Sequence, residues 1–379
     1  MRLSEHRSTI LTKLLQVICA CILSGILVAG LWPFSAPRNE VTWSDQGYGL
    51  HFGKHGSILS SGTFEVAWPE DESACSLEIW LQPSQIQGFS TILAFYRPAN
   101  NVVPFVLGQS LGDLVLQRAA PRRSTKPVRI YVDGVFNDLK PIFLTITSGV
   151  AGTAVYTNGI LEKRTSIFTF SDADLTGQLI LGNMPSTNHS WAGQVDGLAV
   201  YDHELAASEV SRHFAEWTKG TQPDLATAKG VVAAYLFNEG KGDIVHNEIN
   251  SATDLLIPKR FFVLQERFLE CPWNAYRPGW KYWKDVFANI AGFIPLGFFF
   301  CMYFSLVRKM TRAAIVTIAL GFSVSLTIEG LQTFLPTRNS DMTDIITNTL
   351  GTVLGVILCL YIPLWQRLMS CAWNTSPHE

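Results

Sequence analysis

The sequence predicts a multi-domain membrane protein in which an all-β jelly-roll sandwich is joined to an α-helical bundle of four transmembrane spans. Of the 379 residues, 47% are hydrophobic and only 16% are charged, well below the roughly 25% of charged residues in soluble domains. Four apolar segments have about the 20 residues that a helix needs to cross hydrocarbon. The long stretch between the first two alternates in polarity over short β-rich runs, which is typical of strands.

Charge and cysteine content exclude several classes of protein. The formal net charge is −2, with 29 basic and 31 acidic residues, so no patch is available to neutralise nucleic-acid phosphates. The seven cysteines contain no C-x-x-C pair, which excludes a zinc ribbon or a dense disulfide framework. Cys75 and Cys271 lie in the long segment between the first two apolar segments. We favour two free thiols over a disulfide bond between them.

The four predicted spans cover residues 14–34, 286–307, 313–335 and 345–366. Glu329 is the single charged residue within them. The first segment has two interpretations, a cleaved signal peptide or an uncleaved anchor. We favour the anchor, because the apolar run is longer than a signal-peptide core of roughly 7–15 residues and no small-x-small cleavage site follows it.

Short basic segments predict the orientation of the spans. Arg2, Arg7 and Lys13 precede the first span, Arg308, Lys309 and Arg312 join the second to the third, and Arg367 follows the fourth. The positive-inside rule makes these segments cytoplasmic. We therefore expect residues 1–13 and the tail 367–379 in the cytoplasm, and the large segment between the first two spans on the extracytoplasmic side.

The exported segment divides into a domain at 38–257 and a juxtamembrane segment at 258–284. Runs such as 76–81, 91–96 and 143–147 alternate in polarity and are separated by Gly, Asn, Asp and Pro, as in a sandwich or jelly roll. Residues 205–219 have apolar positions at helical spacing. Residues 231–237 read as a strand that closes the sheet near the end of the domain.

Four sequence motifs in the exported domain resemble, in order, the strands of a concanavalin A-like, laminin-G-type domain. They are GLHFG at 49–53, SLEIWL at 76–81, AVYTNG at 154–159 and WAGQVDGLAVYDHEL at 191–205. The resemblance covers about residues 40–257 and implies a lectin-like sandwich, with Leu198 and Val200 facing one side of the last motif's strand. This fold hosts lectins, adhesins, hydrolases and spacers.

Glycan binding by this domain would use exposed aromatic side chains near polar loops, and the candidates are Trp191, Tyr96 and Tyr131. For each of them, packing in the core is the competing interpretation. The loop acids Asp133, Asp172 and Asp174 are candidates for a calcium site, although no ordered series of oxygen ligands is present. The acids form no recognisable glycosidase pair, so catalysis by the sandwich is disfavoured.

Polar residues gather at the predicted outer ends of the last three spans. We expect a shared site formed by Asp285, Asn289, Glu329, Gln332, Arg338, Asp341, Asp344 and Asn348. Their spacings of three, four and seven residues place one polar stripe on each helix. A charge facing lipid costs at least about 2.5 kcal/mol when deeply placed, so the stripes are expected to converge on a pocket. Interfacial anchoring is the alternative for Asp285 and Asp341.

The same residues resemble VanZ-like membrane proteins. The matching patterns are D-x3-N-x2-GF-x-P-x-G at 285–297, S-x3-E-x2-Q at 325–332 and R-x2-D-x2-D-x3-N-x2-G-x3-G at 338–355. The resemblance covers about residues 260–366 plus the first span and implies a bacterial inner membrane. Members of this family are linked with glycopeptide-antibiotic resistance. This chain departs from the family pattern because it carries a long sandwich between its first two spans. Gly351 and Gly355 have a packing interpretation, close helix approach.

Three functions compete. In the first, the outer pocket engages a lipid-linked or peptidoglycan-related ligand while the sandwich holds envelope glycan. In the second, the protein is a membrane-anchored adhesion or protein-interaction module. In the third, the carboxylates carry ions, which is weakest because the inner halves of the spans contain no ionisable relay.

A catalytic version of the pocket would depend on Glu329 and Asp344. Glu329 would be the general base and Arg338 the group that neutralises a phosphate or carboxylate. A divalent cation bridged by Glu329, Asp341 and Asp344 is an alternative arrangement. No other cofactor is evident, and binding ranks slightly above catalysis.

Overall fold

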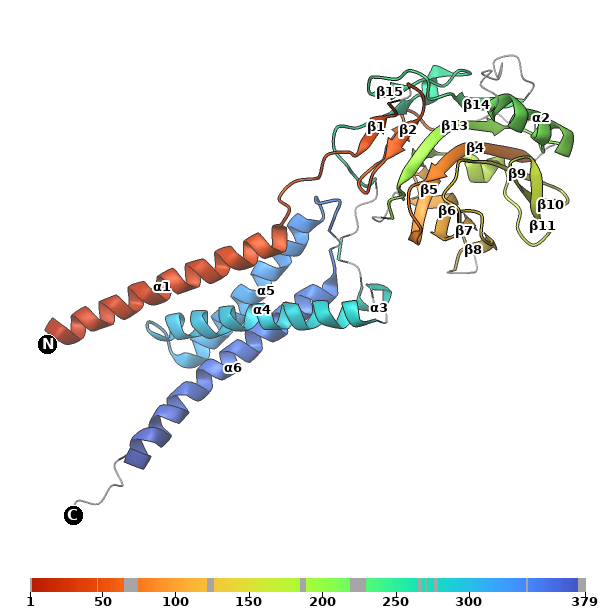
Figure 1. Ribbon diagram of the computed structural model, residues 1–379. Coiled ribbons are helices and arrows are strands. Elements are labelled where there is room, and N and C mark those ends of the chain that lie inside the picture. Colours follow the sequence, from red (N-terminus) through yellow and green to blue (C-terminus); the bar gives the residue numbers. More distant parts are fainter. Residues whose placement is uncertain are drawn as a thin grey trace. The chain divides into compact units, whose positions relative to one another are not determined.

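The computed structural model describes residues 2–45, 47–64, 74–120, 126–184, 189–218, 230–264, 268–269, 271–275, 279–338 and 340–373. The chain divides into two compact units (Figure 1). Ala36–Gln265 forms a β unit, and Met1–Ser35 together with Glu266–Glu379 forms a helical unit. This arrangement confirms the predicted fold class, a β-sandwich plus a four-span helical bundle.

The β unit contains two eight-stranded antiparallel sheets. The first sheet has the order β1-β2-β13-β4-β9-β10-β11, with β14 also paired to β13. Its strands are β1 (Val41–Trp43), β2 (Leu50–Phe52), β4 (Cys75–Pro83), β9 (Ile142–Gly149), β10 (Gly152–Thr157), β11 (Ile160–Thr165), β13 (Gly193–Tyr201) and β14 (Val231–Tyr235). The expected strand at 231–237 is therefore β14, an edge strand beside β13.

The second sheet has the order β15-β16-β3-β12-β5-β6-β7-β8. Its strands are β3 (Ile58–Ser60), β5 (Gln87–Arg97), β6 (Val102–Leu111), β7 (Asp113–Arg118), β8 (Val128–Val132), β12 (Gln178–Leu181), β15 (Ile244–Val245) and β16 (Leu255–Leu256). Two short 3-10 helices, η1 (Asp172–Leu175) and η2 (Ser251–Thr253), lie in the connections.

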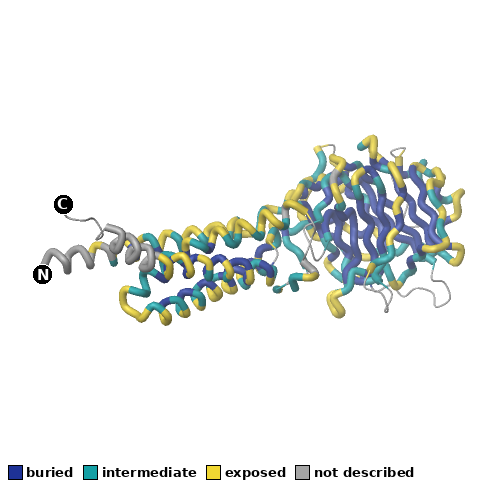
Figure 2. Tube along the Cα trace, turned by 90° about the horizontal axis from the view of Figure 1, so that it is seen from below, coloured by how far each residue is buried: buried dark blue, intermediate teal, exposed yellow. Residues whose placement is uncertain are grey.

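The core lies between the two sheets, and buried residues follow the strands (Figure 2). Leu198 and Val200 belong to this core, as the motif predicts. The alternate residue Tyr201 faces the other side of the sheet, where α2 (Ala207–Thr218) packs through Val210 and Trp217. The helix expected at 205–219 is thus confirmed, with Lys219 outside the described residues.

A buried polar cluster fastens α2 to the sheet. Glu78 on β4 is fully buried and accepts hydrogen bonds from Tyr201 (2.7 Å) and Thr145 (3.2 Å), and the ring of His213 on α2 lies 3.2 Å from it. Burial alone would lower the pKa of His213, but the hydrogen bond and charge of Glu78 raise it above its ordinary value. The stability that this pair contributes to the folded domain is therefore fully present below the pKa of His213 in the unfolded chain. It is lost as the pH rises through the pKa of His213 in the folded protein.

The helical unit contains α1 (Arg2–Leu31), the short α3 (Pro272–Ala275), α4 (Trp280–Ser305), α5 (Met310–Gln332) and α6 (Met342–Trp373). Among the residues that the structure describes, four helical stretches are long and apolar enough to cross a membrane: Thr12–Leu31, Tyr282–Ser305, Met310–Gln332 and Met342–Tyr361. They confirm the four predicted spans. Phe293, Leu296 and Ile328 form a small core with residues of α1.

Helices α4 and α6 approach each other through glycines. A methyl group on Gly351 would meet the carbonyl oxygen of Ile290, and one on Gly355 would meet the carbonyl oxygen of Ile294. Gly297 on α4 is equally close to the backbone of Thr352 on α6. The packing interpretation of the G-x-x-x-G pattern is confirmed, because any side chain at these positions would separate the two backbones.

We predict that Gly355→Ala destabilises the bundle by about 1–3 kcal/mol, the usual cost of overpacking a close contact. Detergent-denaturant unfolding of the full chain, followed by its helical circular dichroism, measures the effect. Gly292→Ala on α4 is the matched control, since nothing lies within 4 Å of the added methyl group. Equal stability of the two variants would contradict the packing argument.

Candidate functional site in the helical bundle

The predicted polar residues of α5 and α6 meet at one end of the bundle. Asp341 lies just before α6, where its Oδ1 accepts the backbone N–H of Thr343 at 2.8 Å. An Asp at this place satisfies one of the free donors of a helix N-terminus. Its own backbone N–H donates to Oε2 of Glu329 on α5 at 2.7 Å. The start of α6 is therefore fixed to the carboxylate of Glu329.

Glu329 is the most deeply placed charged group of the cluster. Its side chain is only 1% exposed, and none of the ion pairs among the described residues includes it. A buried carboxylate without a cationic partner is costly unless hydrogen bonds compensate it. The backbone N–H of Asp341 supplies one such hydrogen bond to Glu329.

Two amide side chains connect the remaining members of the site. Asn289 on α4 donates through Nδ2 to Oδ1 of Asp344 on α6 at 2.8 Å. Asn348, one turn further along α6, donates through Nδ2 to the hydroxyl of Ser325 on α5 at 2.9 Å. These two bonds join α4 to α6 and α6 to α5.

Two buried polar atoms of this site have no hydrogen-bond partner. They are Oδ1 of Asn348, whose residue is 6% exposed, and Oγ1 of Thr343, whose residue is 8% exposed. Buried polar atoms are paired in the great majority of cases, with protein groups or with a bound molecule. Among the described residues, these two atoms therefore lack the pairing that buried polar atoms usually have.

Gln332 and Arg338, expected as ligand contacts, bind the end of α1 instead. Gln332 donates to the carbonyl of Gly30 at 2.8 Å, and Arg338 donates through Nε and Nη2 to the carbonyl of Trp32 at 3.0 and 2.6 Å. The last carbonyls of a helix lack intrahelical partners and carry partial negative charge. These side chains hold the first span against α5. Asp285 is exposed and makes no hydrogen bond among the described residues.

Two further site residues were not predicted. Ser325 stands in the quoted motif four residues before Glu329, so helical spacing alone could have indicated that it shares its face. No spacing in the sequence indicated Thr343, because its burial follows from the way the loop before α6 folds over Glu329.

The residues that the structure describes include no group of three or more His, Cys, Asp or Glu side chains placed to hold a metal ion. The arrangement considered for Glu329, Asp341 and Asp344 around a divalent cation is therefore not formed. The same holds for the acids of the sandwich loops. Asp174 accepts from the backbone of Ser171 in a capping box of η1, and burial raises its pKa.

Two of the three aromatic candidates for glycan binding are core residues. Trp191 is fully buried, and its Nε1 donates to Gln109 at 2.9 Å. Tyr96 is buried and donates to Asn101 at 2.9 Å. For both residues the packing interpretation holds, since Trp191, just before β13, belongs to the core between the sheets and Tyr96 on β5 is buried. Tyr131 on β8 is exposed.

A pocket of about 220 Å³ on the sandwich contains an aromatic pair that the sequence did not indicate. Phe89 on β5 and His189 meet edge to face with ring centroids 5.5 Å apart, and both line the pocket. Lys54, Gln85 and Ser190 supply polar groups around them. An apolar ring beside polar groups is the usual composition of a small-molecule site.

Comparison with known proteins gives two family matches. The VanZ/LLP1 family matches residues 232–365, and the concanavalin A-like lectin/glucanases superfamily matches residues 60–211. The first match begins within β14, earlier than the motif at about residue 260, and so includes the last strands of the sandwich. No curated protein matches the chain.

Solved structures resemble the sandwich at low identity. The botulinum neurotoxin type G receptor binding domain is 14% identical, with 47% of this chain and 45% of that chain covered and a TM-score of 0.34. A candidate carbohydrate-binding protein from Bacteroides ovatus is 11% identical, with 61% and 63% covered and a TM-score of 0.37. This chain spans less than two thirds of each of them. The protein thus carries a VanZ/LLP1 family region together with a concanavalin A-like, laminin-G-type domain.

Proposed function

We propose that this protein is a cell-envelope receptor whose helical site binds the polar part of a lipid-linked or peptidoglycan-related ligand, while its sandwich binds glycan. The observation that carries the proposal is the burial of Glu329 in an apolar bundle, whose described part also contains the unpartnered Oδ1 of Asn348 and Oγ1 of Thr343. An anchor needs only apolar spans, and burial of a carboxylate without a cationic partner is costly unless hydrogen bonds compensate it.

The chemistry of the free groups describes the ligand. Glu329 and Oδ1 of Asn348 are hydrogen-bond acceptors, so the ligand supplies donors such as sugar hydroxyls or amino groups. Arg338 directs its Nε and Nη2 to the carbonyl of Trp32, so fewer of its donors are left for a phosphate. A saccharide or an amine-bearing peptide stem fits these acceptors better than a phosphate does.

Binding fits this arrangement better than catalysis. A general base must reach the proton that it removes, but one oxygen of Glu329 accepts the Asp341 amide and one oxygen of Asp344 accepts Asn289. These bonds hold both carboxylates in fixed positions, as recognition requires. The alternative, an anchored adhesion module, is the conclusion if the variants below behave like the wild type.

We predict that Glu329→Gln weakens ligand binding about 10- to 100-fold, since a hydrogen bond to a charged acceptor contributes about 1.5–3 kcal/mol. The glutamine oxygen still accepts the Asp341 amide, so the start of α6 is preserved. Native mass spectrometry of the full chain purified from its own membranes detects the loss of a co-purified lipid-linked molecule. An envelope-integrity assay in a complemented deletion strain gives the functional readout.

Asp285→Asn is the matched control for Glu329→Gln, because it removes an exposed acid from the same group of predicted residues. It should keep the ligand and the phenotype. If Glu329→Gln and Asn348→Ala both retain the ligand at wild-type levels, the helical site is not a receptor site.

The proposal includes an orientation in which the sandwich is extracytoplasmic and both termini are cytoplasmic. It is supported by the basic segments on one side of the spans. Val150 in the β9–β10 turn and Val307 between α4 and α5 are both exposed and suit cysteine labelling, whereas Asn183 is buried and Ser124 lies outside the described residues.

In a cysteine-free background, we predict that Val150→Cys reacts with a membrane-impermeant maleimide on intact spheroplasts. Val307→Cys should react only after the membrane is opened. Labelling of Val307→Cys from outside would reverse the orientation and remove the extracytoplasmic ligand from consideration.

Glycan binding by the sandwich is proposed for the pocket around Phe89 and His189. We predict that Phe89→Ala reduces binding of the detergent-solubilised full chain to an envelope-glycan array by about 10-fold, because an aromatic contact of this kind contributes on the order of 1–3 kcal/mol including its buried area. Tyr131→Ala is the control, since it removes an exposed aromatic ring outside the pocket. Loss with Tyr131→Ala alone would move the glycan site to β8.

A further inference from the structure

The two ends of the sandwich are paired with each other beside a large groove. Asn39 donates its backbone N–H to the carbonyl of Lys259 at 3.2 Å, and Phe261 donates to Pro37 at 3.1 Å. Arg38 and Arg260 form the antiparallel bridge between these bonds. Both connections to the membrane spans therefore leave the sandwich at one place, and a groove of about 940 Å³ opens there.

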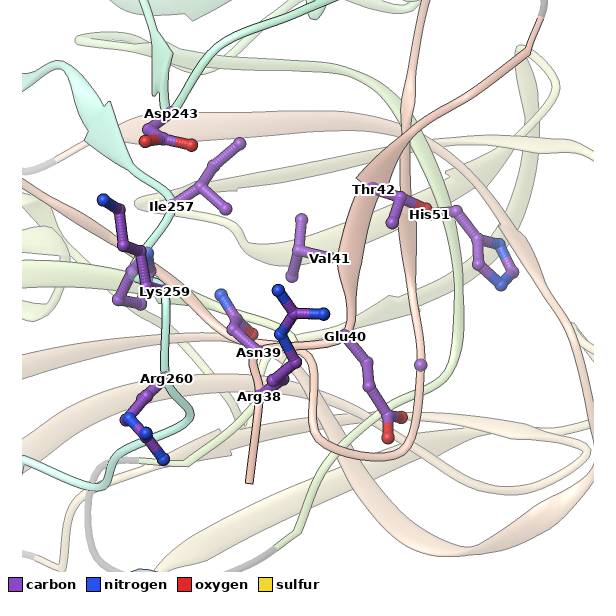
Figure 3. Close-up of a pocket in the computed structure, with 12 residues that line it drawn as sticks. Arg38, Asn39, Glu40, Val41, Thr42, His51, Asp243, Ile257, Lys259 and Arg260 are labelled. Atoms are coloured by element: carbon purple, nitrogen blue, oxygen red, sulfur yellow. The ribbon is translucent and has the colours of Figure 1, made fainter. Parts of the chain in front are cut away.

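Three cations line this groove: Arg38, Lys259 and Arg260 (Figure 3). All three are exposed, and none of them takes part in the ion pairs found in the described part of the chain. One guanidinium nitrogen of Arg260 donates to the carbonyl of Ala36 at 2.8 Å. The remaining donors of the three side chains are available to an anion.

The acids of the groove do not cancel this charge. The carboxylate of Glu40 is held by the backbone and the ring of His55, at 3.2 and 3.3 Å, and these bonds lower its pKa. In Figure 3, Glu40 and His51 lie on the opposite side of Arg38 from Lys259. Asp243 is the other acid, so the lining has a net positive charge.

The composition of the lining selects the class of ligand. Among the described residues, the lining holds one aromatic ring, the imidazole of His51, and no Phe, Tyr or Trp, whereas the other pocket has the ring of Phe89. Arginine forks bind phosphate oxygens in a bidentate manner, and lysine adds a point charge. The groove therefore fits a phosphate group rather than a neutral saccharide.

The covalent chain keeps this groove near a bilayer. Arg38 is the seventh residue after Leu31, where α1 ends, so an extended chain can carry it at most about 25 Å from that helix end. Basic residues near an anionic membrane surface are attracted to it. We infer that Arg38, Lys259 and Arg260 bind the phosphate of anionic phospholipid headgroups and so dock the sandwich on the leaflet that it faces.

The test uses the full chain in nanodiscs of phosphatidylcholine, alone or mixed with phosphatidylglycerol. A fluorophore on Thr42→Cys, in a background without the seven native cysteines, reports on the groove, which Thr42 lines. Quenching by a nitroxide attached to lipid headgroups should rise when phosphatidylglycerol is present and should fall back at high salt. Equal quenching with and without phosphatidylglycerol would overturn the proposal.

The double variant Arg38→Gln, Lys259→Gln should lose the part of the quenching that depends on phosphatidylglycerol, while Arg260 is left in place because of its bond to Ala36. Arg164→Gln on β11 is the matched control, as an exposed arginine outside the groove, and should quench like the wild type. Full quenching in the double variant would contradict the assignment. Protection of the label by an acidic polysaccharide, with no effect of phosphatidylglycerol, would assign the groove to an anionic glycan and overturn the lipid proposal.

Discussion

The close approach of α4 and α6 is the constraint on which the helical site depends. Gly297, Gly351 and Gly355 bring the two backbones into contact, and only at that separation can Asn289 reach Asp344 with a 2.8 Å hydrogen bond. In lipid there is little hydrophobic force to drive helices together, so backbone packing and polar contacts must do so. Here the glycines and the polar cluster act on the same pair of helices.

Much of the fold is present in the pattern of the sequence. The four spans follow from their length and lack of charge, and α2 follows from its apolar spacing. The strand with Leu198 and Val200 has the predicted inward face. The sequence also predicts that four polar residues converge, because a polar group that faces lipid costs free energy on each helix separately. They are Glu329, Asp344, Asn289 and Asn348. These features depend on the local sequence or on the lipid that surrounds each membrane helix.

The roles of single side chains could not be predicted where a distant partner decides them. Gln332 and Arg338 look like ligand contacts until the end of α1 is placed beside them, because the carbonyls of Gly30 and Trp32 become their partners only in the assembled bundle. Trp191 and Tyr96 are buried for a related reason, since each is enclosed by other segments, with Gln109 and Asn101 as hydrogen-bond partners. Phe89 lines a pocket together with His189, which comes from another segment.

The pairing of the sandwich ends explains how a long domain can stand between two spans of one bundle. Arg38 and Arg260 are bridge partners although more than two hundred residues separate them in the chain, so the inserted domain begins and ends at the same place. The chain of the helical unit is therefore interrupted at one point, after α1. Gln332 and Arg338 can still hold the end of that helix, and Glu329 stays buried where α1, α5 and the start of α6 come together. The contacts of α1 with α5 thus lie within the helical unit and do not depend on the length of the inserted domain.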